Sequence, residues 1–345
     1  MASATIGDGE DPGTPMRYVE AEGLRTSVIG LGAWQFGTPD WGWGERFGPP
    51  EARAIVRRAR QLGVTLIDTA ELYGRGESER VLGTILAEPG AREQVVLASK
   101  VAPSWPTRER VKAAAHASLD RLGTDRLDLY QVHWPNPLVP QSSTMAGMRA
   151  LRAGGLVRHV GVSNYSLGRW RDAEAALGAP VVSNQVHYNL LRRKPERDLL
   201  GYAAARGRLI IAYSPLAQGV LGARYTAANP PGGVRATNLL FSEENLRRAA
   251  PVLDALQEIA ATHDATPAQV ALAWVVHHPH VVAIPGARSV AQVEANAAAG
   301  DIVLADDEFL HLGQAADHFQ RDTLVSATAL VGRRARALLR GQQRT

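Results

Sequence analysis

The chain has 345 residues, of which 45% are hydrophobic and 21% are charged, and its formal net charge is +4. These values are ordinary for a globular protein with a sizeable core, and they argue against a disordered chain. The absence of cysteine excludes disulfide bonds and thiolate metal sites. Because the basic residues are scattered except at the C-terminus, we expect no nucleic-acid partner.

The first fifteen residues contain neither a basic start nor an apolar stretch. They therefore lack the features of a signal peptide, and we expect residues 1–15 to be a disordered lead-in. No apolar run approaches the length needed to span a membrane. We therefore expect a cytoplasmic protein with no membrane partner.

The rest of the chain alternates between short apolar runs and amphipathic stretches. Residues 16–27 predict two short strands joined by a turn that contains a glycine. Core strands are expected at 28–34, 65–70, 95–101, 127–133, 158–163, 181–187, 208–213 and 280–284. Helices are expected at 50–62, 77–87, 107–122, 143–153, 168–177, 196–206, 243–262, 267–278 and 289–298.

Each of these eight core strands is followed by at least one helix. Such an α/β alternation fits either an open doubly wound sheet or a closed (β/α)8 TIM barrel, and eight units favour the barrel. The Gly-rich stretch at 30–37 follows a strand without opening a helix, so it is a weak dinucleotide-binding signal. We predict a barrel domain over 16–319 and a basic helical tail over 320–345. This tail could pack on the barrel, join a partner or contact an acidic surface, and we favour the first.

Four polar residues lie at or just after the ends of the predicted strands: Asp68, Tyr73, Lys100 and His133. Polar side chains at the C-terminal ends of barrel strands are typical of catalytic residues. A phenol is a poor acid near neutral pH, but an ammonium beside it favours the phenolate and lowers its pKa. Lys100 could act in this way with Asp68 as its ion-pair partner, while His133 could donate to the same substrate oxygen. The four residues together predict a proton donor for a carbonyl oxygen, with Tyr73 as the general acid.

Lys100 is notable because the chain contains only two other lysines, Lys112 and Lys194, and otherwise uses arginine for positive charge. A coding bias would explain the scarcity. A lysine retained at a strand end nevertheless indicates a need for a compact ammonium whose pKa can be tuned.

The hydride for such a reduction must come from a cofactor, and a nicotinamide is the simplest choice. Ser163, Asn164 and Gln185 follow or end predicted strands and could hydrogen-bond a carboxamide. Tyr213 could stack on a flat ring. Arg288 lies at the start of the last predicted barrel helix, and an arginine at a helix N-terminus is typical of a phosphate site.

The motifs that carry these residues resemble those of the aldo-keto reductases over residues 16–317. LIDTAELYGRGESERVLG is similar to the segment with the family's aspartate and tyrosine, LASKV to its lysine strand and LYQVHWP to its histidine strand. GVSNYS, NQVHYN, AYSPLAQGVLG and IPGAR follow in the order of its cofactor-binding stretches. The resemblance is to the bacterial and potassium-channel-β-like branch of the family.

This resemblance implies a (β/α)8 barrel whose N-terminal hairpin closes the bottom, and NADPH bound at the C-terminal mouth. It implies reversible reduction of an aldehyde or ketone, with the catalytic roles on the four polar residues named above. It also implies a cofactor-binding set, namely Gly32, Trp34, Ser163, Asn164, Gln185, Tyr213, Ser214, Leu216, Gly219, Gly286, Arg288, Gln292 and Asn296. Members with a Lys-Ser pair after the last strand differ from this chain, which has Gly286 and Ala287 there. NADH is therefore retained as a weaker alternative cofactor.

Aromatic residues are concentrated in the segments that follow strands. Five of the seven tryptophans lie there: Trp34, Trp41, Trp43, Trp105 and Trp134. This density favours an apolar pocket for an aromatic or polycyclic carbonyl over simple rim packing. We expect Trp34, Trp105 and Trp134 to line the substrate pocket.

Two other functions remain open at this stage. A nicotinamide-binding regulatory subunit with residual reductase activity would carry the same four residues. Metal-assisted hydrolysis is disfavoured, because no His and carboxylate cluster has the spacing of metal ligands, so we expect no metal. We expect a monomer or a weak homo-oligomer acting on a small carbonyl compound.

Overall fold

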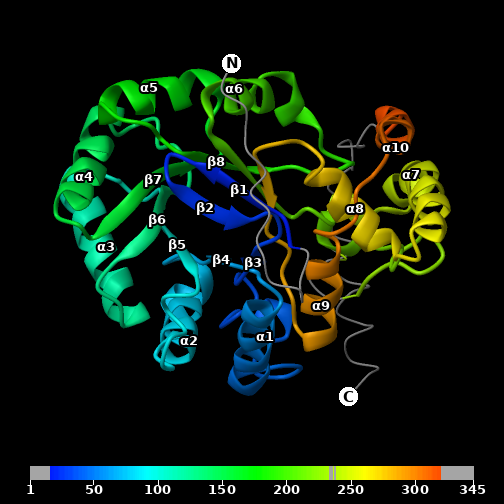
Figure 1. Cartoon of the computed structure of the whole chain (residues 1–345), viewed down its shortest axis with the longest axis horizontal. Coiled ribbons are helices and arrows are strands. Elements are labelled where there is room, and N and C mark those ends of the chain that lie inside the picture. Colours follow the sequence, from blue (N-terminus) through cyan, green and yellow to red (C-terminus); the bar gives the residue numbers. More distant parts are fainter. Residues whose placement is uncertain (1–15, 233–235, 237, 320–345) are drawn as a thin grey trace, which may run out of the picture.

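The computed structural model describes residues 16–232, 236 and 238–319, and its centre is a ring of eight parallel strands surrounded by helices (Figure 1). The strands are hydrogen-bonded in the order β10-β9-β8-β7-β6-β5-β4-β3. Bridges between Ile29 and Ala283 and between Gly32 and Gly286 join the first strand to the last and close the ring. The (β/α)8 barrel predicted from the sequence is confirmed.

The barrel strands are β3 (Leu31–Gly32), β4 (Leu66–Asp68), β5 (Val96–Val101), β6 (Leu127–Val132), β7 (Val157–Ser163), β8 (Ser183–His187), β9 (Leu209–Tyr213) and β10 (Val281–Ala283). The surrounding helices are α1 (Pro49–Gln61), α2 (Glu77–Leu86), α3 (Arg108–Leu122), α4 (Gln141–Ala153), α5 (Leu167–Leu177), α6 (Leu199–Arg206), α7 (Glu243–Thr262), α8 (Pro267–Val275), α9 (Val290–Ala298) and α10 (Asp306–Asp317). The sequence did not predict α10, which packs against α7.

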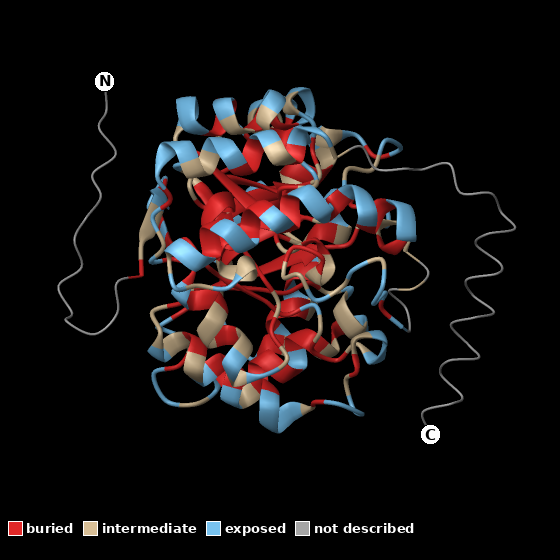
Figure 2. Cartoon of the chain, turned by 90° about the vertical axis from the view of Figure 1, so that its right-hand side faces the viewer, coloured by how far each residue is buried: buried red, intermediate tan, exposed pale blue. Residues whose placement is uncertain are grey.

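The helix boundaries follow local capping signals. Helix α8 begins after Thr266, which accepts a hydrogen bond from the Gln269 amide in a capping box, and Pro267 occupies the first turn. Helix α3 ends at Gly123, whose backbone is left-handed with φ 60°. Figure 2 shows the resulting pattern, in which the helices are buried on the face toward the strands and exposed on the other.

The lower part of the barrel interior is apolar and is covered by the N-terminal hairpin of β1 (Tyr18–Ala21) and β2 (Leu24–Ser27). Ala21 and Leu24 of the hairpin pack in one buried cluster with inward residues of five barrel strands, which are Leu66, Ala98, Leu129, Leu209, Ile211 and Val282. Figure 1 shows the hairpin lying across this end of the barrel. The predicted N-terminal closure is therefore present.

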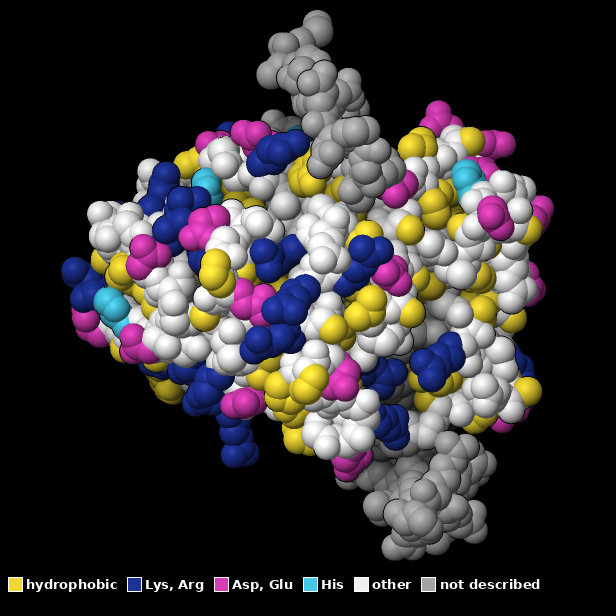
Figure 3. All heavy atoms as spheres, turned by 60° about the horizontal axis from the view of Figure 1, so that its bottom comes forward, with side chains coloured by type: hydrophobic (Ala, Val, Ile, Leu, Met, Phe, Trp, Pro, Cys, Tyr) yellow, Lys and Arg dark blue, Asp and Glu magenta, His cyan; other side chains and the backbone are white. Residues whose placement is uncertain are grey.

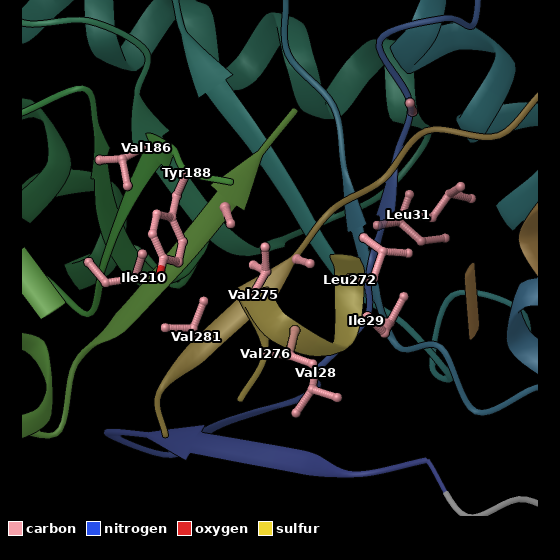
Figure 4. Packing of buried hydrophobic residues seen from close by; sticks show 14 of the residues in the cluster. Val28, Ile29, Leu31, Val186, Tyr188, Ile210, Leu272, Val275, Val276 and Val281 are labelled. Carbon is pink, nitrogen blue, oxygen red and sulfur yellow. The ribbon is translucent and has the colours of Figure 1, made fainter. Parts of the chain in front are cut away.

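A second core lies between the strands and the helices. Figure 4 shows part of it, where Leu272 and Val275 of α8 and Val276, which caps that helix, lie near Val28 and Ile29 just before β3. All five side chains are buried. This packing places α8 beside the seam at which the barrel closes.

Some sequence-based expectations lie outside the described residues, namely the lead-in over 1–15 and the basic tail over 320–345. No helix in the part of the chain that the structure describes is long and apolar enough to cross a membrane. Figure 3 shows one face on which Lys and Arg side chains are interspersed with Asp and Glu. The expectation of no nucleic-acid partner stays a prediction.

Gly161 of β7 is required by the packing inside the barrel, which gives a test of the fold. A Cβ at this position would lie 2.5 Å from Oγ of Ser183 and 2.9 Å from Cγ of Gln131. We expect Gly161→Ala to lower the free energy of unfolding by about 1–3 kcal/mol, since overpacking forces neighbours to move. Urea denaturation would measure this loss.

Gly168→Ala in α5 is the matched control, because nothing lies within 4 Å of a Cβ built there. This variant is expected to keep or slightly raise the stability of the protein. Equal effects of the two substitutions would contradict the packing inferred inside the barrel.

Candidate active site

The four polar residues predicted from the sequence meet at the C-terminal end of the barrel around the ammonium of Lys100. Its Nζ lies 2.6 Å from Oδ2 of Asp68, 2.8 Å from the carbonyl oxygen of Thr69 and 3.2 Å from the hydroxyl of Tyr73. Lys100 and Asp68 are almost fully buried. The ring of His133 lies edge-on to Tyr73, with centroids 5.6 Å apart. All four side chains therefore belong to one site.

Tyr73 owes its position to an unusual turn after β4. Gly74, Arg75 and Gly76 all have left-handed backbone angles, with φ of 55°, 56° and 87°. A Cβ at Gly74 would lie 2.4 Å from the carbonyl oxygen of Gly37. Glycine is thus needed directly after Tyr73 both for the turn and for the close approach of the two loops. The turn brings the phenol back over the strand ends.

The second oxygen of Asp68 accepts two amide hydrogen bonds. Nε2 of Gln185 donates at 2.8 Å and Nε2 of Gln131 donates at 3.3 Å. The sequence analysis missed Gln131. The signal was available, because Gln131 is two residues before His133 in the predicted strand 127–133, and alternate residues of a strand face the same side.

Burial sets the protonation of the site. It raises the pKa of Tyr73 above its usual value, although Lys100 beside it acts in the opposite direction. The expected lowering by Lys100 is therefore present but smaller than the effect of desolvation. Burial alone would lower the pKa of Lys100, but Asp68 and Tyr73 outweigh it and the pKa is raised. The lysine stays charged, and the phenol stays protonated until it has an acceptor.

His133 is neutral at physiological pH. Burial, together with the positive charge of Lys100, lowers its pKa to about 3. Its Nδ1 is buried and has no hydrogen-bond partner among the described residues. A neutral imidazole beside Tyr73 can donate one hydrogen bond to a substrate oxygen without adding a charge to the site.

The residues predicted to hold the carboxamide form a continuous hydrogen-bonded row. Oγ of Ser163 donates to the carbonyl of Gln185 at 2.9 Å, and Nδ2 of Asn164 donates to that Oγ at 2.9 Å. The hydroxyl of Tyr213 donates to Oδ1 of Asn164 at 2.9 Å. This row fixes the rotamers of three strand-end side chains next to the catalytic group.

A cavity of about 630 Å³ opens above these residues. It is lined by every predicted site residue except Lys100 and Trp105, that is by Gly32, Trp34, Asp68, Tyr73, His133, Trp134, Ser163, Asn164, Gln185, Tyr213, Ser214, Leu216, Gly219, Gly286, Arg288, Gln292 and Asn296. Lys100 is buried beneath the lining. Several further lining residues were not assigned from the sequence, among them Gln35, Leu72, Arg224 and Tyr225. Leu72 lies inside the motif that carries Asp68 and Tyr73, whereas Arg224 and Tyr225 follow the AYSPLAQGVLG motif.

The aromatic loops divide into two groups. Trp34, Trp41 and Trp134 line the cavity, and Trp34 and Trp41 contact each other edge to face with centroids 5.0 Å apart. Trp43 instead packs against Phe47, with centroids 5.2 Å apart. Trp105 is 61% exposed and is not among the described residues that line the cavity. The structure therefore does not bring Trp105 to the predicted pocket.

The far end of the cavity is suited to an anion. Arg288 precedes α9, whose first turn is capped by Ser289, so the arginine lies just before the helix rather than in its first turn. Burial and the nearby Arg224 and Arg46 lower the pKa of Arg288. Cations held this close together indicate a site for a negatively charged group.

Gly286 and Gln35 both line the cavity and lie against each other. A Cβ at Gly286 would lie 1.9 Å from Nε2 of Gln35, so a larger residue there would force the Gln35 side chain to move. Oε1 of Gln35 is buried without a hydrogen-bond partner among the described residues. A buried acceptor left in this way is available to a ligand. The lining thus has the features that an extended dinucleotide requires.

Comparison with known proteins agrees with this geometry. The model of the Aldo/keto reductase family matches residues 28–317. An uncharacterized oxidoreductase of Mycobacterium tuberculosis is 55% identical over 290 residues, which cover 84% of this chain and 89% of that protein. The NADH-specific methylglyoxal reductase of Escherichia coli is 30% identical, over 86% of this chain and 97% of that protein.

Solved structures of aldo-keto reductases are also similar to this chain. The aldo-keto reductase Tm1743, solved with the inhibitor epalrestat, is 33% identical, and the match covers 86% of this chain and 99% of that one with a TM-score of 0.72. An aldo-keto reductase from Klebsiella pneumoniae, solved with NADPH, is 32% identical over 90% of this chain and 99% of that one, with a TM-score of 0.70.

The depressed pKa of His133 predicts a pH dependence of stability. The unfolded chain has a histidine pKa of about 6.5 and the folded site one of about 3, so between these values the unfolded state binds more protons. Stability is therefore lost as the pH falls below 6.5. Between pH 7 and pH 5 this histidine alone should cost about 2 kcal/mol of unfolding free energy.

His133→Gln removes the titrating group and keeps a polar side chain. Urea denaturation at the two pH values should give a smaller loss for this variant than for the wild type, by about 2 kcal/mol. Equal losses in the two proteins would contradict the assignment of a buried neutral histidine.

Proposed function

The chain belongs to the aldo/keto reductase family, and from the site described above we propose that it reduces an aldehyde or ketone to an alcohol with NADPH. The observation that carries this proposal is the position of Lys100, which contacts both Asp68 and Tyr73 through one ammonium. The arrangement holds a protonated phenol at the floor of a cavity large enough for a cofactor and a substrate.

When bound, a nicotinamide cofactor supplies the hydride that no side chain of the protein can supply. Ser163, Asn164 and Gln185 would hold its carboxamide, and Tyr213 would stack against the ring. The unpartnered oxygen of Gln35 offers a polar contact in the cavity lining. Arg288 and Arg224 would hold its phosphates.

The proton comes from the hydroxyl of Tyr73. The substrate carbonyl oxygen receives hydrogen bonds from this phenol and from the neutral ring of His133, which together orient it. As the oxygen gains negative charge, the phenolic proton moves to it, and the phenolate left behind is stabilised by Lys100 at 3.2 Å. Asp68 keeps the ammonium in place, and both of these charged groups are buried beside the phenol.

The cation-rich end of the cavity favours the cofactor with the additional phosphate. Arg288 lies with Arg224 and Arg46 nearby, so the local potential is positive. A Klebsiella pneumoniae relative was solved with NADPH, whereas a relative from Escherichia coli is named for NADH. We therefore assign NADPH as the preferred cofactor and NADH as the weaker one.

The substrate side of the cavity is apolar. Trp34, Leu72 and Trp134 line it and remain 43%, 49% and 46% exposed. Large apolar side chains left in contact with water at a cavity mouth gain free energy when a ligand covers them. This favours an aromatic or polycyclic carbonyl over a small polar one.

Removing the phenol tests the proposed acid. Tyr73→Phe should lower turnover of an aryl aldehyde by at least about 10²-fold, the usual contribution of a general acid. Dissociation constants for NADPH, measured by fluorescence, should stay unchanged. Arg75→Ala, two residues later, exposed in the same loop and not among the described residues that line the cavity, controls for disturbance of the loop. Near-normal turnover in Tyr73→Phe would refute the mechanism.

Removing the arginine tests the cofactor preference. Arg288→Ala should weaken NADPH binding by about 1–3 kcal/mol, because a hydrogen-bonded charge contact is lost. The loss for NADH should be smaller, since NADH lacks the 2′-phosphate. Fluorescence titration with both cofactors gives the comparison, and Arg53→Ala on helix α1, which is not among the described residues that line the cavity, controls for net charge. Equal losses for both cofactors would contradict a role for Arg288 in recognising this phosphate.

A further inference from the structure

Gln131 is a buried amide whose presence inside the barrel needs a reason. It is fully buried in β6, and its Oε1 has no hydrogen-bond partner among the described residues. A buried unpaired oxygen destabilises the folded state, and an apolar side chain of similar size would avoid that cost. Among the described residues, its side chain makes one hydrogen bond, from its Nε2 to Oδ1 of Asp68.

The orientation of this amide follows from the charge of its neighbour. Asp68 pairs with Lys100 through Oδ2, so its carboxylate is ionised and can only accept hydrogen bonds. The amide atom that faces Oδ1 must therefore be the nitrogen, and Oε1 is left without a partner. The unpaired oxygen is thus a consequence of the donation to Asp68.

The surroundings also keep Gln131 in this place. Lys100, Gln131, Gly161 and Ser183 lie side by side on four neighbouring strands, in one row of the register. The absence of a side chain at Gly161 leaves the space that Gln131 occupies, because a Cβ there would lie 2.9 Å from Cγ of Gln131. The packing therefore leaves the amide little freedom to move away from Asp68.

Gln185 makes a similar contact with Asp68 but has a second task. Its Nε2 donates to Oδ1 at 2.8 Å, and its side chain also lines the cavity. Gln131 is not among the described residues that line the cavity. The donor from β6 thus stays with Asp68 whatever occupies the cavity, whereas the donor from β8 is exposed to changes there.

We propose that Gln131 is a positioning residue for the proton transfer, which holds the Asp68 carboxylate so that Oδ2 points at Lys100 and Lys100 stays against Tyr73. Gln131 touches neither substrate nor cofactor. Its effect passes through Asp68 and Lys100 to the phenol, so this inference rests on the function proposed above.

Gln131→Met tests the proposal, because methionine fills a similar volume without a donor. We expect the single-turnover rate of carbonyl reduction to fall about tenfold, the equivalent of one hydrogen bond to a charged group. The melting temperature should stay the same or rise, since the unpaired oxygen is removed, and the dissociation constant for NADPH should stay within about twofold. A residue with only a structural role would instead lose stability and rate together.

The pH profile gives a second readout. Asp68 raises the pKa of Lys100, so a less well aligned carboxylate should let the lysine lose its proton at lower pH. The alkaline limb of the rate profile of Gln131→Met should therefore move to lower pH. In Gln131→Glu, the introduced carboxyl can donate only when protonated, so its rate should recover as the pH falls.

Ser183→Ala is the matched control. It removes another buried oxygen that lacks a partner among the described residues, from the same row, without a hydrogen bond to Asp68. Its rate and pH profile should equal those of the wild type.

The outcomes separate this proposal from the function on which it rests. If Tyr73→Phe is impaired, three results for Gln131→Met would overturn the role of Gln131 alone. These are an unchanged rate, a fall in rate matched by a fall in melting temperature, and an alkaline limb that does not move to lower pH. Normal turnover in Tyr73→Phe would overturn both proposals.

Discussion

The site depends on one buried ion pair between Lys100 and Asp68. Both side chains are almost completely removed from water, at a separation of 2.6 Å. Burying two charges costs several kcal/mol per ion, and the attraction between them often does no more than offset that cost. Such a pair is therefore poor evidence for stability. Its retention at the centre of the barrel is better explained by what the ammonium does for Tyr73.

The barrel makes this burial tolerable by alternating its side chains. Inward positions on β4, β5 and β6 carry Leu66, Ala98 and Leu129, which belong to the apolar layer that packs against the hairpin. Two residues later, the same strands present Asp68, Lys100 and Gln131. Because side chains on a strand alternate with a period of two, the two sets form successive layers of the interior. The two charges of the polar layer can be satisfied because the ammonium, the carboxylate and the amide donors come from neighbouring strands.

Much of this arrangement could be predicted from the sequence. The apolar runs that end in Asp68, Lys100 and His133 marked both the strands and the side of the barrel where the site lies. Helix α10 was missed because it follows the last barrel strand and helix, where the alternation of strands and helices no longer predicts a further element. Trp105 was misplaced because nearness to a strand end does not fix where a loop turns. Its backbone has φ 50°, a left-handed angle that a sequence pattern does not reveal for a tryptophan.

Gln131 shows why pattern and chemistry must be combined. In the sequence it lies inside the LYQVHWP motif, two residues before His133, but no pattern there distinguishes it from a tolerated polar substitution. Only the distances show that it donates to the same oxygen as Gln185. A carboxylate that accepts from a lysine and from two amides has a fixed orientation, and the lysine it holds is fixed in turn. On our proposal, the position of the phenol at the cavity floor thus depends in part on Gln131, which is not among the described residues that line the cavity.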